Sequence, residues 1–396
     1  MCTRRVSWAS CLALLAAAGG AQTNPTLLDL PSGWTELAGS DMASAGWPLV
    51  PDCDYGAPCE IASGGIIAYS GAALDSERRR IVLWGGGHND FFGNQLLLFD
   101  LLQLQWQVEQ PPTSILQYEL DEQGEAVSAY KFMNGLPVSR HTYDHIGIID
   151  HLGGVLFSFS GACADAPLYN AGSSFGDVWT YDFVAGAWTD HTPFVTGGQD
   201  FYLTEPGASG EYDPVTERWY HLTAEGIWSY DFESRNWARI TESGHPGIER
   251  SSVLDTARRK IWSYGGDYGG DATLSAFDID DGVFEIVSFD NPPGVRSAAG
   301  LTYDPISDRL VLFGGSSDSS IWTYDPESMT WAEHTEAGGP PGSAVYSRFL
   351  YDPIHDLFLL VHSPESVWVW KRAAPGVIFA DGFESGNTEA WTGSMP

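Results

Sequence analysis

Polar side chains suited to proton transfer and hydrogen bonding crowd one short stretch, GGGHNDFFGN, which lies between two apolar runs. It holds His88, Asn89, Asp90 and Asn94. The imidazole of His88 can exchange a proton near neutral pH. Two uses of the stretch are open. One is a ligand site; the other is a self-contained loop in which His88 and Asp90 bond the loop's own backbone, while the glycines and Asn94 supply positive φ.

A second stretch, SRHTYD, carries Arg140, His141 and Tyr143. The His141 imidazole is a second group that titrates near neutral pH, and Tyr143 can act as acid or base where a neighbouring cation lowers its pKa. A metal site made of His88, Asp90 and His141 is chemically allowed, but no tight ligand spacing supports it, so we expect neither a metal nor another cofactor. The candidate catalytic residues are therefore His88, Arg140, His141 and Tyr143, and the candidate ligand-binding residues in the loop are Asn89, Asp90 and Asn94.

The elements that must position these residues belong to a repeat. Its first landmark is an Asp followed six residues later by a large aromatic residue, as in Asp100 with Trp106 and Asp325 with Trp331. Its second is a turn such as Tyr-Asp-Pro ahead of an apolar run, and a glycine doublet often lies between the two. Short β-forming runs bounded by turn residues predict strands. A period of roughly 40–50 residues with four strands per unit predicts a propeller blade.

At these landmarks the chain resembles the Kelch family of β-propellers. The resemblance implies an all-β fold over residues 63–372. We count six units, and the sixth stops after its third strand, SVWVW. The segment GWTEL at 33–37 is expected to supply the missing strand and to close the ring. Six blades are therefore predicted, with seven as the alternative if 41–61 or the insertion at 110–137 hides another. The sequence therefore predicts four parts of the chain: a leader at 1–21, an N-terminal segment at 22–62, the propeller at 63–372 and a tail at 373–396.

Propeller topology places the loop between the second and third strands on the same face as the segment that leads into the first strand. The GGGHNDFFGN loop and SRHTYD should therefore face one another across a blade boundary. Arg250, Arg296 and Arg348 occupy related positions in later units. We take these three as ligand-binding residues, because a local positive funnel suits a carboxylated or sulfated ligand.

Composition limits the partners and the compartment. Lys and Arg total 19 against 52 Asp and Glu, a net charge of −33, which disfavours nucleic acid and anionic membrane surfaces. Two arginines, an apolar run and small residues before Gln22 predict a secretory signal peptide cleaved after Ala21. We expect a secreted protein, extracellular or periplasmic, that acts as a monomer and does not span a membrane.

Cys53, Cys59 and Cys163 remain after the leader is removed, and an oxidising compartment favours one disulfide. The turn-prone loop between Cys53 and Cys59 makes that pair the preferred one, although three cysteines allow any single pair.

Two functions are consistent with the sequence. The first is a binding propeller for an anionic carbohydrate or protein ligand at the channel mouth. The second is a polysaccharide lyase, because GGGHNDFFGN followed by SRHTYD is similar to propeller lyases of the ulvan-degrading type, which use His, Tyr and Arg in the channel. In that interpretation arginine neutralises a uronate carboxylate, and His or Tyr removes the adjacent proton. Galactose oxidase shares the propeller, but its copper site needs a Tyr-His pair on the channel face. Here the Tyr220-His221 pair is expected in a second strand, after a turn, so copper oxidase chemistry is disfavoured. The sequence leaves open whether the protein is an enzyme.

Overall fold

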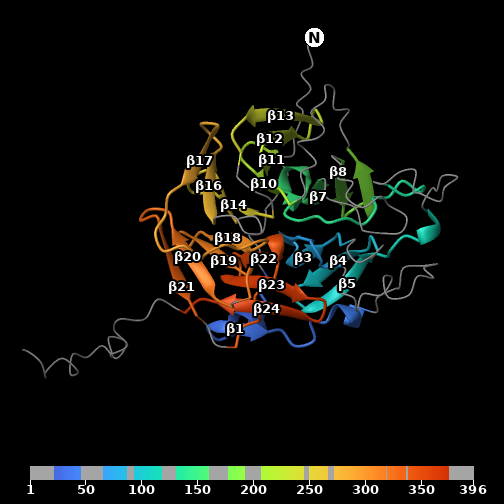
Figure 1. The fold of residues 1–396 in the computed structure, drawn as a ribbon. Helices are drawn as coiled ribbons and strands as arrows, with labels where there is room; N and C mark the ends of the chain where they lie inside the picture. The colour runs from blue at the N-terminus through green and yellow to red at the C-terminus, as the bar shows by residue number, and fades with distance from the viewer. Residues whose placement is uncertain are drawn as a thin grey trace, which may run out of the picture.

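A computed structural model describes residues 22–45, 66–86, 93–117, 131–159, 177–191, 207–244, 249–265, 272–317, 319–335 and 338–373. These residues form six four-stranded antiparallel sheets, so the predicted all-β propeller with six blades is confirmed. Figure 1 shows the sheets arranged around a common centre. Within the described ranges, helix is confined to the short α1 (Pro25–Leu28) and to single 3₁₀ turns at η1 (Met42–Ala45), η4 (Ile115–Gln117), η5 (Asp150–Leu152) and η7 (Tyr346–Arg348).

Each blade runs from an innermost to an outermost strand in chain order. Blade 1 is β2 (Ala72–Asp75), β3 (Arg80–Leu83), β4 (Leu96–Asp100) and β5 (Gln105–Gln110); blade 2 is β6 (Ile146–Ile149), β7 (Val155–Phe159), β8 (Val178–Asp182) and β9 (Ala187–Asp190). Blade 3 is β10 (Ser209–Asp213), β11 (Arg218–Thr223), β12 (Gly226–Asp231) and β13 (Asn236–Thr241); blade 4 is β14 (Ser251–Asp255), β15 (Lys260–Gly265), β16 (Thr273–Asp278) and β17 (Val283–Val287). Blade 5 is β18 (Gly300–Asp304), β19 (Arg309–Phe313), β20 (Ile321–Asp325) and β21 (Thr330–His334).

Blade 6 joins the two ends of the described chain. Its inner strands are β22 (Phe349–Asp352), β23 (Leu357–Ser363) and β24 (Ser366–Lys371), and its outer strand is β1 (Gly33–Glu36). Strand β1 pairs antiparallel with β24, with Trp34 opposite Trp370, and the blue strand lies beside the red one in Figure 1. The predicted closing strand is confirmed, and it covers what would otherwise be an open edge of β24.

The recurring aspartates end strands because their side chains cap the turns that follow. Asp100 Oδ1 accepts hydrogen bonds from the amides of Leu102 and Gln103, at 2.7 and 2.9 Å. The fourth residue after the Asp then adopts positive φ, as Leu104 does at 55°. The same geometry recurs after Asp182, Asp231, Asp278 and Asp325. An Asx-type cap of this kind explains the regular spacing of the landmark.

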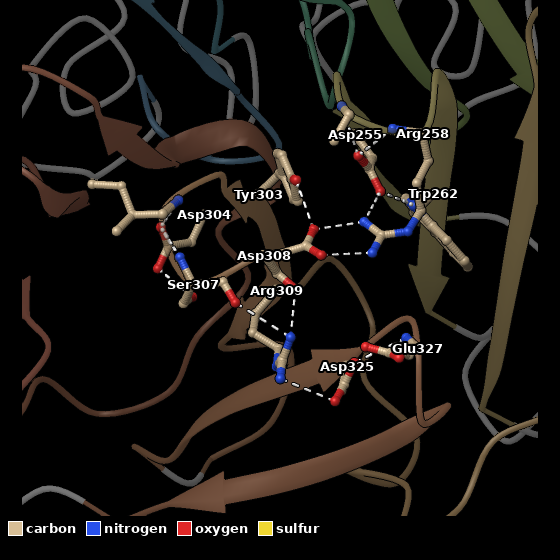
Figure 2. Close-up of polar contacts among 12 residues, drawn as sticks. Asp255, Arg258, Trp262, Tyr303, Asp304, Ser307, Asp308, Arg309, Asp325 and Glu327 are labelled. Carbon is tan, nitrogen blue, oxygen red and sulfur yellow. Dashed lines mark hydrogen bonds and ion pairs between the residues drawn. The ribbon is translucent and has the colours of Figure 1, made fainter. Parts of the chain in front are cut away.

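The turns between first and second strands form one face of the ring, here called the turn face. Figure 2 shows how this face holds neighbouring blades together. The Arg258 guanidinium of blade 4 bonds both carboxylate oxygens of Asp308 in blade 5 at 2.6 Å, and it also bonds Asp255 in its own blade at 3.0 Å. Tyr303 donates to Asp308 at 2.8 Å. Further ion pairs between blades lie on this face, among them Arg259 with Asp213 and Arg372 with Asp304.

Apolar side chains fill the space between adjacent blades. One cluster joins blades 1 and 6 and includes Leu97, Phe99 and Val369, and another joins blades 4 and 5 around Trp331. Among the described residues, no helix is long and apolar enough to cross a bilayer.

Candidate functional site

The predicted loop residues and thiols lie outside the described part of the chain: His88, Asn89, Asp90, Cys53, Cys59 and Cys163. The loop and the disulfide therefore stay predictions. The remaining candidates all lie on the face opposite the turns, here called the mouth face, where the chain leads into each innermost strand.

A ring of residues with positive φ surrounds the centre of the mouth face. One residue before each innermost strand adopts this conformation: Tyr69, Tyr143, Gly207, Glu249, Ala298 and Tyr346, with φ between 46° and 69°. Backbone hydrogen bonds link neighbouring members, such as Tyr143 N to Tyr69 O at 2.8 Å and Ala298 N to Glu249 O at 2.8 Å. Left-handed conformation at non-glycine residues has a cost that surrounding contacts must offset, and it often marks functional sites.

The ring turns three tyrosines toward the axis. The ring centroids of Tyr69 and Tyr143 lie 6.1 Å apart, and those of Tyr143 and Tyr346 lie 5.5 Å apart. Tyr143, Tyr346 and Ala298 are buried and pack as one cluster, with the half-buried Tyr69 against it. These side chains come from the segments that lead into blades 1, 2, 5 and 6, so together they close the channel at the mouth face.

His141 sits directly on this tyrosine cluster. Its imidazole stacks on Tyr69, with centroids 4.8 Å apart and planes inclined by 28°. Its Nδ1 lies 3.2 Å from the Tyr143 hydroxyl. The structure therefore brings together two of the predicted catalytic residues, His141 and Tyr143, and adds Tyr69, which sequence reasoning missed. No local motif marks Tyr69, because its role depends on the ring that forms only when the blades close.

Arg140 points away from His141 into blade 2. Its guanidinium forms an ion pair with Asp177, its Nε donates to the Val138 carbonyl at 3.1 Å, and it lies 5.7 Å from the Trp84 ring. Both members of the ion pair are buried, at 2% and 3% exposure. Burial raises the pKa of Asp177, while the charge and hydrogen bond of Arg140 oppose that rise. Arg140 therefore stabilises the start of β8 through its ion pair with Asp177.

The three later arginines are also buried, at 0% for Arg250 and 2% for Arg296 and Arg348. Each guanidinium bonds backbone carbonyls of its own blade at or near the connection between the second and third strands, and Arg348 also donates to the Ser70 carbonyl in the segment that leads into blade 1. Arg250 reaches Gly265 at 2.7 Å and Thr273 at 2.9 Å, and Arg296 reaches Gly314 at 2.9 Å. Burial lowers the pKa of Arg250 and of Arg348 to about 10. Their donors are thus directed at the blade backbone, although their charges remain near the mouth face.

Asn94 is fully buried and ties the insertion to blade 1. Its Nδ2 donates to Thr113 Oγ1 at 3.1 Å and to the Pro137 carbonyl at 2.9 Å, and its Oδ1 accepts from Thr113 N at 2.8 Å. The Trp84 indole donates to the Asn94 carbonyl at 3.1 Å. Asn94 does not adopt positive φ. Its amide therefore fixes both ends of the insertion, a use that neither interpretation of the loop anticipated.

Below the tyrosine cluster the channel contains two carboxyl groups that sequence reasoning did not select, the buried Asp144 and the partly exposed Glu211. Asp144 Oδ2 accepts hydrogen bonds from Ser252 N at 2.7 Å and from Ser252 Oγ at 2.8 Å, and that hydroxyl also lies 3.3 Å from Glu211 Oε1. Burial raises the pKa of Asp144 to about 8, against hydrogen bonds from Ser252 and Gly210. Burial, together with the charge of Asp144, raises the pKa of Glu211 well above its usual range. Three separate blades supply this group.

No protein-family model matches the chain, and a search of curated proteins found no match. The six-bladed fold is therefore established by the structure alone, and function has to be argued from the geometry of the site.

Proposed function

We propose that the chain is an exported, Kelch-like propeller that binds an anionic carbohydrate at the mouth face, over Tyr69 and His141. The observation that carries the proposal is the stacked Tyr69–His141 pair, supported from beneath by the buried Tyr143 and Tyr346. Sites for small ligands combine aromatic surfaces with a few placed polar groups. His141 covers one face of the Tyr69 ring and is 7% exposed, so a pyranose ring would lie on the exposed part of Tyr69 and bond the accessible edge of the imidazole through a hydroxyl group.

The preference for an anionic sugar rests on Arg348. Its Nε donates to the Ser70 carbonyl at 2.9 Å, so its charge lies beside Tyr69, across the boundary between blades 6 and 1. Its other nitrogens donate to the carbonyls of Ala344, Val361 and His362. The Arg348 charge attracts a carboxylate or sulfate at the mouth face, and because the ligand approaches through solvent, salt weakens that attraction. The predicted signal peptide would bring the protein to such ligands outside the cytoplasm.

Affinity electrophoresis tests the proposal. Gels that contain uronate-rich or sulfated polysaccharides should retard the protein, gels that contain neutral dextran should not, and added salt should reduce the retardation. His141→Ala should weaken binding about thirtyfold, because a ring contact and a hydrogen bond contribute about 1 kcal/mol each. His334→Ala is the matched control, because His334 lies exposed on the outer strand β21. Equal retardation by neutral and acidic gels, or equal binding by both variants, would refute the proposal.

A second candidate, β-elimination on a uronate polysaccharide, is favoured by the 3.2 Å approach of His141 Nδ1 to the Tyr143 hydroxyl. One of the pair would remove the proton next to the carboxylate, and the other would protonate the departing glycosidic oxygen. Arg140 is already bonded to Asp177, so another cation would have to neutralise the carboxylate. The unsaturated product absorbs in the ultraviolet. An absorbance that rises during incubation with uronate polysaccharides, and does not rise with His141→Ala, would establish lyase activity. Binding without any rise in absorbance would support the binding function alone.

A further inference from the structure

The central channel encloses a cavity of about 260 Å³, lined by residues from all six innermost strands. At the mouth face it ends beneath Tyr143, Ala298 and Tyr346, which are at most 5% exposed. At the turn face its rim residues keep exposed surface, among them Leu74, Tyr212 and Tyr351. The cavity therefore opens on the turn face, away from the carbohydrate site proposed above.

The walls of this cavity combine aromatic rings with acid. Tyr212, Trp219, Phe349 and Tyr351 contribute aromatic side chains, and Asp144 and Glu211 contribute the two carboxyl groups. Glu211 keeps exposed surface although it lies deep in the channel, so that surface faces the cavity. Among the described lining residues, none is lysine, arginine or histidine. Aromatic faces with nearby carboxylates and no competing cation are the surroundings that favour an organic ammonium group.

Trp219 forms a fixed aromatic part of the cavity wall. Its ring reaches the channel between two glycines: a Cβ added at Gly210 would lie 2.6 Å from Trp219 Nε1, and one at Gly147 would lie 2.7 Å from the ring edge. The side chain is 2% exposed, and Nε1 has no hydrogen-bond partner among the described residues. The indole N–H lies against Gly210, which precedes Glu211 in the cavity wall, and Nε1 is inaccessible to solvent. Trp219 therefore contributes an aromatic surface to the cavity rather than a hydrogen-bond donor.

We propose that the channel binds a small organic ammonium cation, of the choline or ethanolamine class. The ammonium group would lie against Asp144 and Glu211 and the aromatic walls. The cavity volume corresponds to roughly nine water molecules at about 30 Å³ each, which is enough for a molecule of this size.

Titration calorimetry with choline chloride and with ethanolamine on the full chain tests this site. Because the Asp144 carboxyl holds its proton below a pKa of about 8, and a cation favours the ionised form, affinity should rise between pH 7 and pH 9. The other titratable groups that line the cavity are Glu211, which shifts the same way, and the hydroxyls of Tyr212 and Tyr351, whose pKa values are raised.

The variants separate a binding role from a structural one. Glu211→Gln should lower choline affinity at least tenfold, while the matched Glu233→Gln, on an exposed turn after β12, should leave it unchanged. If Glu211→Gln does not fold, Tyr351→Leu serves instead, because it removes an aromatic side chain from the cavity wall; it should lower affinity several-fold. Absence of heat with both amines at pH 9, unchanged affinity in the variants, or binding of calcium alone would overturn the proposal. Carbohydrate binding is measured separately, so either proposal can fail without the other.

Discussion

Replacement of Trp34 by Ala should weaken the closure of the ring. Trp34 lies in β1, and its ring packs 5.0 Å from Phe313, 6.4 Å from Phe349 and 6.5 Å from Trp368, measured between centroids. These contacts attach the N-terminal strand to the apolar layer between blades 5 and 6. The substitution leaves the backbone pairing with β24 intact, so it isolates the contribution of packing.

The magnitude follows from burial. Truncation of a fully buried Trp to Ala costs about 3–5 kcal/mol, and Trp34 is half-buried, so about 2–3 kcal/mol is expected. In a chain of this size that corresponds to a melting temperature lower by roughly 4–9 °C, if about 2–3 °C is lost per kcal/mol. Trp34→Phe keeps a ring in the same position and should lose less than half as much.

Differential scanning calorimetry and urea unfolding of the three proteins provide the measurement. Val184→Ala is the control, because Val184 is 88% exposed and its truncation should leave the melting temperature unchanged. A melting temperature for Trp34→Ala within about 1 °C of the parent would correspond to a loss too small for a packed indole, and would show that β1 packing does not hold the ring closed. Equal losses for the Ala and Phe variants would instead assign the effect to packing of the larger indole ring system, because the Trp34 N–H has no hydrogen-bond partner among the described residues.

Three other outcomes follow from the structure. Deletion of residues 24–37 should cost more stability than Trp34→Ala, because it also removes the β1–β24 pairing; a smaller loss in thermal unfolding would contradict the closure. Arg140→Ala should destabilise the protein by about 3–5 kcal/mol in urea unfolding, because it leaves Asp177 buried without its ion pair, and an unchanged midpoint would refute that role. The bond from Arg258 lowers the pKa of Asp308 to about 2, so the pair contributes stability above pH 4 that is lost as the pH falls toward 2. Arg258→Gln should therefore flatten the fall in melting temperature between pH 4 and pH 2, and a parallel fall in both proteins would count against it.

The sequence by itself determined the blade repeat and the closure. Asp100 and its counterparts cap turns through local hydrogen bonds to residues two or three positions ahead, so their spacing is readable without the fold. The missing fourth strand of the last unit and the isolated GWTEL segment similarly required only strand counting, and β1 pairs with β24 as expected.

Only the tertiary structure decided what the polar residues do. The sequence predicts Arg250, Arg296 and Arg348 as ligand-binding residues at the channel mouth, yet blade closure buries each of them against backbone carbonyls. Asp144 and Ser252 are 108 residues apart and meet only because blades 2 and 4 flank the same channel. Local sequence patterns determine which strand or turn a residue belongs to. The burial of a side chain near the channel and its hydrogen-bond partners depend on how the six blades pack together, and no local pattern encodes that packing.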